Sequence, residues 1–425
     1  MRILVVSNLY PPDFMGGYEL GCRQVVEALT HAGHDLLVLT SPTARPAAAQ
    51  PRVRRNFVFT QGLPLPYGGP TPTDQAIALR HAEGGVVNAH NVAVLVATIE
   101  EFRPEVIYLW NLGGIGGLGI AGAIAYLQLP TVWHLMDAVP NQAASLSQGS
   151  TTATASLLCA LSQRLRSVYI ACSRRLAREI SVAGFDFGGN LRIVPNWATP
   201  PPEEVDRQYF TPGGGLLKVV SAGQLAPHKG VQHIIEAARL LIRDGRVGFQ
   251  VEIFGPGLED QFASLIMRQG VQRFVTLKGS LPQHELVDEY WNRDVFLMPT
   301  WTREPFGFAS LEAARRGCVP IVSRDCGYAE WFVDGLHCLK VAPTAQSISL
   351  TLSSILDGKI ALESIARRAM DVARDDFSID NALPQIEKAF ADASQIPIRR
   401  AGLYDDSLRL ARLAEALLRD HVESA

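Results

Sequence analysis

A pair of glutamates brackets the passage from a loop into a helix in the stretch Thr302-Arg-Glu-Pro-Phe-Gly-Phe-Ala-Ser-Leu-Glu-Ala. Glu304 falls in the loop, and Glu312 falls inside the helix that follows. The backbone N–H groups of residues 307–309 would be donors at the helix start, and such donors bind phosphate or sugar hydroxyls. About one turn deeper, the Glu312 carboxylate can accept hydrogen bonds from both hydroxyls of a ribose. Taken alone, the pair is more simply an acidic loop beside a glutamate that favours the helix dipole.

A lysine stands at the start of another helix, in the stretch Ser221-Ala-Gly-Gln-Leu-Ala-Pro-His-Lys-Gly-Val. From that position the ammonium group of Lys229 can meet the negative charge of a diphosphate. The alternative is a solvated loop lysine, which is the commoner fate of this residue type.

Two glycines, Gly16 and Gly17, separate the first apolar run of the chain from the helical pattern after it. Because glycine has no side chain, the backbone at such a point can approach a phosphate or a sugar closely. A glycine pair by itself is more often only a turn, so its meaning depends on the rest of the pattern.

Short apolar runs typical of buried parallel strands precede these candidate residues and alternate with helical patterns along the chain. In the first half, strands are expected over 2–7, 35–40, 106–110, 131–135, 167–172 and 191–194, with a helix ending near Gly33. In the second half, strands are expected over 217–221, 250–254, 274–277, 295–298 and 319–322, and helices over about 230–243, 258–269, 283–291 and 309–316. The alternation predicts an α/β fold with two tandem doubly wound parallel sheets, and a ligand is expected in a cleft between them at the carboxyl ends of the strands.

The segment 200–215 is rich in Pro, Glu and Gly and is the best domain boundary in the chain. The expected division is a first domain over 1–205, a second over 206–378, and C-terminal helices over 379–425 that return to the first domain. Residues 42–75 are rich in Pro, Gly and Arg and read as a long surface excursion.

A helical pattern from residue 403 on places Leu410, Leu413 and Leu417 on one face. The favoured interpretation is a helix that packs on its own protein. A contact with another subunit or with a membrane surface is the weaker alternative.

The composition is that of a globular protein without a strong charge bias. Of the 425 residues, 47% are hydrophobic and 19% are charged, so the chain can bury sizeable cores. With 39 Lys and Arg against 42 Asp and Glu, nothing favours nucleic acid as a partner. The chain does not open like a secretory signal, and its apolar runs are too short for a membrane-spanning helix. Six scattered cysteines without paired spacing argue for reduced thiols in a cytoplasmic protein and against a metal site.

The order and spacing of the motifs carry more information than any one of them. The opening strand with its glycine pair, G-x-L-x-x-x-K-G after the linker, and E-P-F-G-x-x-x-x-E together resemble glycosyltransferase family 4, a retaining family with the two-domain GT-B fold. The similarity runs from residue 1 to about 390, and it includes Val194-Pro-Asn196, Gly279-Ser280-Leu281 and Glu330 with Val333-Asp334-Gly335. It implies a Rossmann-like acceptor-side domain, then a Rossmann-like domain that binds the nucleotide sugar, with no cofactor.

The resemblance implies a role for each matching residue. Gly17 would approach the diphosphate or the sugar of the donor, and Lys229 would neutralise the diphosphate. Glu304 would contact the transferred sugar, Glu312 would hold the ribose, and the segment 279–281 would lie along the base. The full implied donor site, for a UDP-, GDP- or other nucleoside-diphosphate sugar, is Gly17, Gln224, Lys229, Gly279, Ser280, Leu281, Glu304, Phe306, Gly307, Phe308 and Glu312.

One departure from the family pattern affects the diphosphate. Gln224 stands where the family usually has an arginine that shares the diphosphate charge with Lys229. Because the amide carries no charge, weaker stabilisation of the leaving group is expected unless another cation helps. Arg303 and His228 are the nearby candidates in sequence.

Two further departures lie in the first domain. The family often has a His-Asp pair after the strand, but here Met136 precedes Asp137. His134 lies on the same strand face as Met136 and either replaces the family histidine or is simply buried. Trp110-Asn111 stands where His-Asn is frequent, so the ring could stack on an acceptor sugar. Trp110, Asn111 and Asp137 are therefore expected on the acceptor side.

A second fingerprint points to another class of enzyme. Gly114, Gly116 and Gly119 fit G-x-G-x-x-G between a strand and a helix, and Asp137 follows at a spacing typical of dinucleotide-binding units. An NAD-dependent oxidoreductase is therefore an alternative, although this motif does not follow the opening strand and leaves the glutamate pair unexplained. Glycines that open a helix can also serve packing alone. A GT-B protein that binds sugar nucleotides without turnover is a third interpretation, which Gln224 would allow.

The chemistry that the resemblance implies is metal-independent transfer of a sugar with retention. Breaking the sugar–diphosphate bond builds negative charge on the leaving group, which Lys229 and the helix start at Gly307 can stabilise. Retention follows most simply from front-face attack, with the departing phosphate taking the acceptor's proton. The candidate catalytic residues are Glu304, Lys229 and His134, of which Glu304 is a conceivable covalent nucleophile. The acceptor, whether a glycan, a lipid or a small molecule, is left open.

Overall fold

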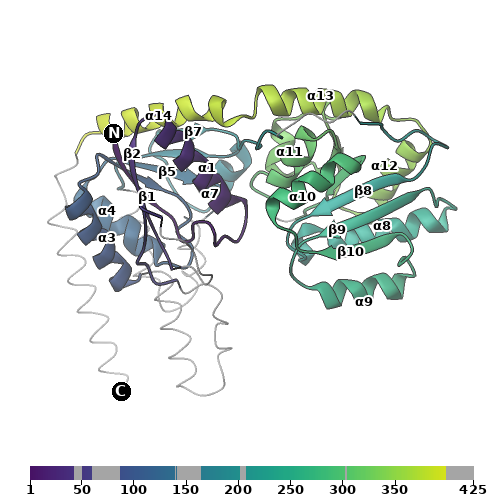
Figure 1. Cartoon of the computed structure of the whole chain (residues 1–425), viewed down its shortest axis with the longest axis horizontal. Coiled ribbons are helices and arrows are strands. Elements are labelled where there is room, and N and C mark those ends of the chain that lie inside the picture. Colours follow the sequence, from purple (N-terminus) through teal and green to yellow (C-terminus); the bar gives the residue numbers. More distant parts are fainter. Residues whose placement is uncertain are drawn as a thin grey trace, which may run out of the picture. The chain divides into compact units, whose positions relative to one another are not determined.

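The computed structural model describes residues 1–42, 50–59, 87–138, 140, 164–201, 207–301 and 304–398. These residues form two compact units, and Figure 1 labels many of their elements. The first unit comprises Met1–Cys172, Leu176–Val194 and the chain from Leu383 on, and the second comprises Ser173–Arg175 and Pro195–Ala382. The chain thus leaves the first unit before the predicted border at 205/206 and returns to it after the predicted border at 378/379. The helical pattern predicted from residue 403 on, and most of the 42–75 excursion, lie outside the described residues.

Parallel strands form the sheet of the first unit in the order β3-β2-β1-β4-β5-β6-β7. Their bounds are β1 Arg2–Val6, β2 Asp35–Thr40, β3 Val53–Arg55, β4 Val106–Leu109, β5 Thr131–Leu135, β6 Ser167–Ala171 and β7 Leu191–Ile193. The strands predicted in this half are all present close to their expected bounds. β3 was not predicted, because it lies inside the segment 42–75 that was expected to be an irregular surface excursion. Its three residues pair with β2, and so short a run carries no alternation from which a strand can be predicted.

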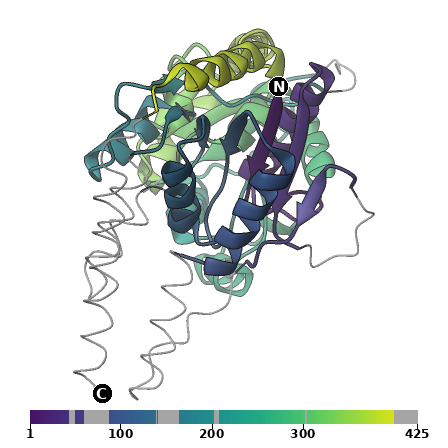
Figure 2. The ribbon, with the colours of Figure 1, turned by 90° about the vertical axis from the view of Figure 1, so that its left-hand side faces the viewer.

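Helices cover the sheet of the first unit. They are α1 Gly17–His31, α3 Ala89–Phe102, α4 Gly117–Leu127, α7 Arg174–Val182 and α14 Ile379–Gln395. α3 and α4 lie side by side against the strands (Figure 2). Phe390 of α14 packs edge to face on Tyr108 of β4, with ring centroids 5.0 Å apart. This cover explains why strands such as β4 and β5 are buried along their whole length.

The second unit holds another parallel sheet, in the order β10-β9-β8-β11-β12-β13. Its strands are β8 Leu217–Ala222, β9 Phe249–Phe254, β10 Val275–Gly279, β11 Val295–Met298, β12 Val319–Ser323 and β13 Leu339–Val341. Its helices are α8 Val231–Arg243, α9 Glu259–Gln269, α10 Gln283–Glu289, α11 Phe308–Arg315, α12 Ala345–Leu356 and α13 Leu362–Asp375. β13, α12 and α13 have no counterpart in the prediction. For α12 the signal was present, since Ile348, Leu352 and Ile355 follow a helical spacing and are buried in the core.

In both sheets the strand order reverses next to the first strand. β1 lies between β2 and β4, and β8 lies between β9 and β11. At such a point the connections after the two central strands diverge and leave a crevice at the carboxyl edge, where ligands bind in open α/β sheets. The structure therefore confirms the predicted pair of doubly wound parallel sheets, and it directs attention to the loops after β8 and β11.

Candidate functional site

The loops after β8 and β11 are held against each other by backbone contacts. A single 3-10 turn, Pro227–Lys229, follows β8 and ends at Gly230, whose φ is 77°. A Cβ at position 230 would lie 2.2 Å from the carbonyl oxygen of Pro299, so only glycine allows this approach. The Trp301 amide donates to the carbonyl oxygen of His228 at 3.1 Å, and the Thr300 hydroxyl donates to the same oxygen at 3.0 Å. These contacts place the end of the turn beside the loop after β11.

Lys229 and Glu304, predicted from separate motifs, form an ion pair at this edge. The distance from Nζ to Oε2 is 2.5 Å, and the side chains are 29% and 12% exposed. Water and salt screen a partly shielded pair less than a pair on the open surface. The attraction between the Lys229 ammonium group and the Glu304 carboxylate is therefore stronger here, and it holds the two side chains against each other. An anion that reaches the lysine would compete with the glutamate for the same ammonium group.

The segment that carries Glu304 is fixed by its neighbours in the second unit. The carbonyl oxygens of Glu304 and Phe306 accept hydrogen bonds from the amides of Gly327 and Tyr328 at 3.0 and 2.7 Å. The Phe306 ring is buried against Tyr328, with centroids 6.4 Å apart. Gly307, with φ 108°, then opens α11, and no side chain among the described residues caps the first turn of that helix. The predicted donors at the start of α11 are therefore on a rigid loop, while the Phe306 side chain serves the core.

Glu312 lies inside α11 and is only 7% exposed. Its Oε1 accepts a hydrogen bond from Gln283 Nε2 of α10 at 2.6 Å. Burial raises the pKa of this carboxyl to about 7, although the Gln283 hydrogen bond and the nearby Arg316 guanidinium oppose the rise. Gln283 was not among the predicted site residues, because nothing in the sequence links the two helices.

The remaining predicted donor residues of the second unit lie at or just after the ends of β10 and β8, at the same edge of the sheet. Gly279, with φ 72°, closes β10, and its carbonyl oxygen accepts from the Gly255 amide at 2.9 Å. Ser280 is exposed and Leu281 is half-buried. Gln224 is exposed in the loop after β8, so its neutral amide faces solvent beside the turn that holds Lys229. Of the two cations considered as helpers, His228 lies in that turn and Arg303 lies outside the described residues.

In the first unit, a residue absent from the prediction holds the glycine loop. Glu19 of α1 is buried, and its Oε2 accepts from the amides of Met15 and Gly16 at 3.1 and 3.0 Å. Its Oε1 accepts from the side-chain amide of Asn111 at 2.9 Å. A glutamate three positions after an N-cap is a known capping pattern, so this signal was available in the sequence. The loop at Gly17 and the loop after β4 are thereby joined.

The first unit also corrects the expectation for Trp110. Its side chain is fully buried and stacks on His134, with centroids 4.4 Å apart, so it cannot stack on an acceptor sugar in this conformation. Of the two roles considered for His134, the structure supports the buried one. Its Nδ1 lies 2.7 Å from the Tyr108 hydroxyl, and burial lowers the pKa of its imidazole to about 3. Asp137 is half-buried and accepts from the amide of Ala138 at 2.8 Å.

The glycine fingerprint after β4 has a packing explanation. Gly116 has φ 72°, and a Cβ there would lie 2.3 Å from the backbone nitrogen of Asn88. A Cβ on Gly119 would lie 3.0 Å from a methyl carbon of Val87. These glycines let α4 approach the residues that precede α3, which is the packing role left open as an alternative to dinucleotide binding.

Two family models match the chain in tandem. The model described as "Glycosyl transferase 4-like domain" matches residues 16–197, and the model described as "Glycosyl transferases group 1" matches residues 203–372. Together the two matches show a glycosyltransferase of the group 1 type. The resemblance to family 4 inferred from the motifs is confirmed.

Some curated relatives of this glycosyltransferase match nearly its whole length, and others match less than half of it. The glycogen synthase of Mycobacterium tuberculosis is 24% identical over 434 residues, which cover 96% of this chain and 99% of the relative. The D-inositol 3-phosphate glycosyltransferase of Corynebacterium aurimucosum is 31% identical over 43% of this chain and 44% of its own.

Solved structures share the fold of this glycosyltransferase. Sucrose-phosphate synthase from Thermosynechococcus elongatus matches with a TM-score of 0.68 at 15% identity, over 92% of this chain and 98% of the other. Anabaena HepE in complex with UDP and glucose matches with a TM-score of 0.65 at 19% identity, over 92% of this chain and 100% of the other. These likenesses confirm the predicted GT-B fold class with its two Rossmann-like domains.

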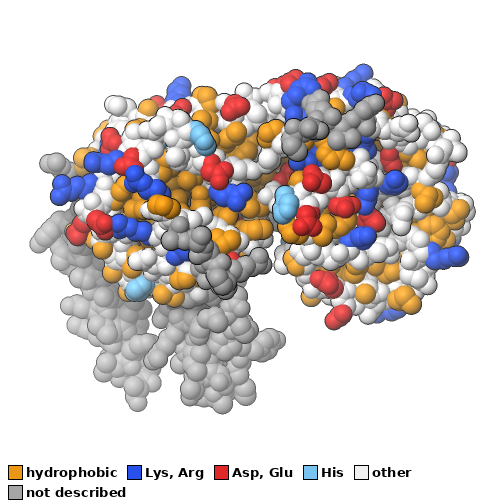
Figure 3. Space-filling model, viewed as in Figure 1, with side chains coloured by type: hydrophobic (Ala, Val, Ile, Leu, Met, Phe, Trp, Pro, Cys, Tyr) orange, Lys and Arg blue, Asp and Glu red, His pale blue; other side chains and the backbone are white. Residues whose placement is uncertain are grey.

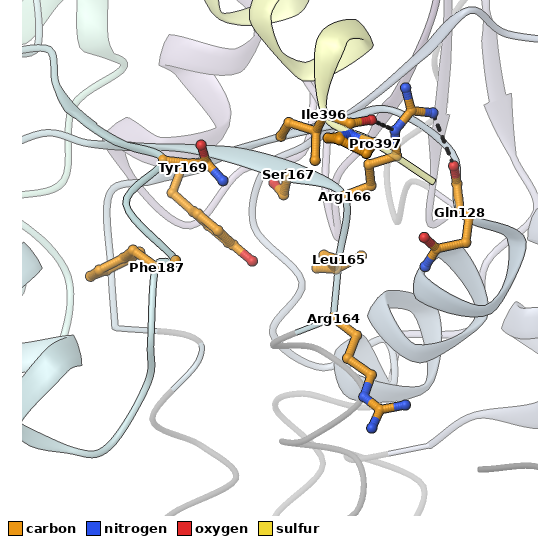
Figure 4. Close-up of a pocket in the computed structure, with 11 residues that line it drawn as sticks. Gln128, Arg164, Leu165, Arg166, Ser167, Tyr169, Phe187, Ile396 and Pro397 are labelled. Carbon is orange, nitrogen blue, oxygen red and sulfur yellow. Dashed lines mark hydrogen bonds between the residues drawn. The ribbon is translucent and has the colours of Figure 1, made fainter. Parts of the chain in front are cut away.

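Other features of this glycosyltransferase lie apart from the candidate residues. A cavity of about 30 Å³, roughly one water in size, lies before β6 and beside the end of α14 (Figure 4). Its Arg166 donates to the carbonyl oxygens of Ser394 and Gln128 at 2.6 and 3.3 Å, which makes it a structural tie. On the face shown in Figure 3, acidic and basic side chains of the described residues are interspersed.

No described helix combines the length and the apolar character that crossing a membrane requires. The described residues also contain no group of three or more His, Cys, Asp or Glu side chains placed to hold a metal ion.

Proposed function

We propose that this glycosyltransferase moves a hexosyl group from a nucleoside-diphosphate sugar to the hydroxyl of an acceptor, with retention and without a metal. The acceptor is a glycan, a lipid or a small molecule. The observation that carries the proposal is the ion pair between Lys229 and Glu304 at the carboxyl edge between β8 and β11.

Lys229 fits the leaving group. When the bond between the sugar C1 and the diphosphate oxygen breaks, negative charge collects on the diphosphate, and a preorganised cation stabilises that charge without reorganising. The backbone amides at the start of α11 supply further donors on the same loop as Glu304. With the lysine engaged by the diphosphate, the Glu304 carboxylate becomes available to the hydroxyls of the sugar.

Front-face attack would give retention without a second carboxylate. In front-face attack, the acceptor oxygen bonds to C1 on the side from which the diphosphate leaves, and the acceptor proton passes to a departing phosphate oxygen. This step uses the positioning and charge of Lys229 and Glu304 rather than a general base, in keeping with the buried, neutral His134.

Support for the donor class comes from the site and from a structural neighbour. Glu312 offers a buried carboxylate for the ribose hydroxyls, and residues 279–281 end β10 at the same edge. Anabaena HepE, which shares the fold, has been solved in complex with UDP-glucose. The neutral Gln224 favours weaker diphosphate binding than an arginine would give, so loss of turnover is the alternative that an assay must exclude.

Transfer itself is the test. Purified protein is incubated with a nucleotide sugar and a mixture of glycan, lipid and small-molecule acceptors, with and without EDTA, and the anomeric configuration of the product is read by NMR. The proposal predicts a product of the donor's own configuration and a rate that EDTA leaves unchanged. An inverted product would overturn the retaining mechanism, and loss of the rate in EDTA would overturn metal independence.

A further inference from the structure

The carboxylate of Glu312 is held by a side chain from a different helix. Gln283, on the first turn of α10, donates from Nε2 to Oε1 at 2.6 Å. Among the described residues, Gln283 is the side chain that hydrogen-bonds this carboxylate. An ionised carboxylate offers about four lone-pair sites, so one such bond leaves others for the two hydroxyls of a ribose.

The surroundings of Glu312 disfavour its charge. Because the side chain is almost fully buried, it loses hydration, and burial favours the neutral acid. The charged and titratable groups that face it are Arg316, directly after the end of α11, and the Tyr290 phenol after α10, with Asp288 acting on Arg316. A neutral amide donor such as Gln283 stabilises the ionised form without cancelling its charge.

The geometry points to Gln283 as a positioning residue for donor binding. We propose that its amide holds the Glu312 carboxylate in the orientation in which the ribose hydroxyls of a nucleotide sugar can donate to it. This inference rests on the proposed function, since it assigns the ribose to Glu312. Gln283 itself need not touch the reacting atoms, so its removal should act on donor binding rather than on the chemical step.

The test is the pH dependence of the donor KM. The donor used is whichever of UDP-glucose, GDP-mannose and ADP-glucose stabilises the wild-type protein. Gln283→Met keeps the size of the side chain and removes the donor group, while His284→Ala on the same helix is the control, because that side chain is 81% exposed. KM and kcat are measured from pH 6 to pH 9 for the wild type and both variants.

The expected result follows from losing a hydrogen bond to the ionised form. The midpoint at which KM rises with falling pH should move from near 7 to about one unit higher, because a charge-assisted bond is worth about one pKa unit or more. The KM ratio of Gln283→Met to wild type is then roughly fivefold at pH 7, close to tenfold at pH 6 and near one at pH 9. The kcat should stay within about twofold, and His284→Ala should follow the wild type.

A KM ratio that does not change with pH, or a fall in kcat at unchanged KM, would overturn the inference. If Gln283→Met does not fold, Gln283→Glu replaces it, and the added negative charge should move the midpoint higher still. The proposed function fails separately, through the absence of stabilisation by any of the three nucleotide sugars. Binding that depends on Glu312 with a wild-type pH profile in Gln283→Met would leave the function standing and remove the inference alone.

Discussion

At the scale of single residues, the proposed donor site depends on charges that the fold keeps partly out of water. Lys229 and Glu304 contact each other at 2.5 Å, and Glu312 is almost fully buried. Water hydrates such charges poorly, so a ligand that supplies matching groups gains more from them than it would on the open surface.

Replacing Lys229 by Met should lower kcat by about a hundredfold, because the lost interaction is strongest when the diphosphate carries its full charge. The matched control is Lys218→Met, since Lys218 is an exposed lysine on β8 away from the carboxyl edge. Steady-state kinetics at saturating donor measures both variants. Turnover at the wild-type rate in Lys229→Met would remove the lysine from the diphosphate site.

Glu312 should also make the stability of the protein depend on pH. Its pKa is about 7 in the folded state and near 4.5 in the unfolded chain, so the folded state binds more protons between these values. Stability contributed at this position therefore falls as pH rises from about 5 to 8, by roughly 2 to 3 kcal/mol. Glu312→Gln has no charge to bury at this position. The stability of the variant minus that of the wild type should therefore be larger at pH 8 than at pH 5.

Urea unfolding of the wild type and Glu312→Gln at the two pH values measures this gain. Glu285→Gln serves as the control, because Glu285 lies on α10 with a side chain that is 55% exposed. A stability difference that is the same at pH 5 and pH 8 would show that Glu312 is ionised as easily in the folded protein as in the unfolded chain.

At the scale of elements, glycines decide where loops and helices approach each other. Gly230 lets the turn after β8 lie on Pro299, and Gly116 lets α4 begin beside Asn88. The first contact brings together the two loops of the proposed donor site, whereas the second packs the first unit. Glycine therefore allows a close contact between loops in one unit and between a helix and a loop in the other.

Gly116→Ala should destabilise the protein by more than Gly33→Ala. Both positions have a positive φ, which costs an alanine about 1 to 2 kcal/mol, but a Cβ at position 33 meets no atom within 4 Å. The excess cost at position 116 therefore measures the clash with Asn88, and chemical denaturation of the two variants gives it. Equal costs would contradict the packing role of the glycine fingerprint.

Local sequence predicts some of the elements and not others. Strands such as β1, β5 and β11 were predictable because buried parallel strands are continuous apolar runs. The three-residue strands β3 and β13 have too few residues to show a period. The E-P-F-G motif and the lysine turn identified the residues that form the Lys229–Glu304 pair, because loops after strands carry the sites of doubly wound sheets.

The burial of Trp110 and His134 was not predictable from their own neighbourhoods. It depends on packing among β4, β5, α1 and α14, and the Phe390 ring that covers β4 comes from the far end of the described chain. The Gln283–Glu312 hydrogen bond likewise joins two helices whose contact has no local signature. Residues that act through long-range contacts are thus the part of the site that a single sequence conceals.

At the scale of the whole molecule, the two units repeat one sheet plan, but the candidate donor residues gather in the second. Lys229, Glu304, Glu312 and the end of β10 all belong to it. In the first unit, Glu19 holds the glycine loop, and Trp110, which follows β4, is buried. Recognition of the nucleotide should therefore respond to changes in the second unit.

The central claim is that this glycosyltransferase binds a nucleotide sugar through the second unit. The most direct measurement is thermal stabilisation by a panel of UDP-, GDP-, ADP- and dTDP-sugars, with NAD and NADP included and no metal added. We expect a clear shift with one nucleotide sugar, lost in Glu312→Ala and kept in Glu285→Gln. A shift only with NAD or NADP would contradict it and make the loop at Gly114, Gly116 and Gly119 the cofactor site.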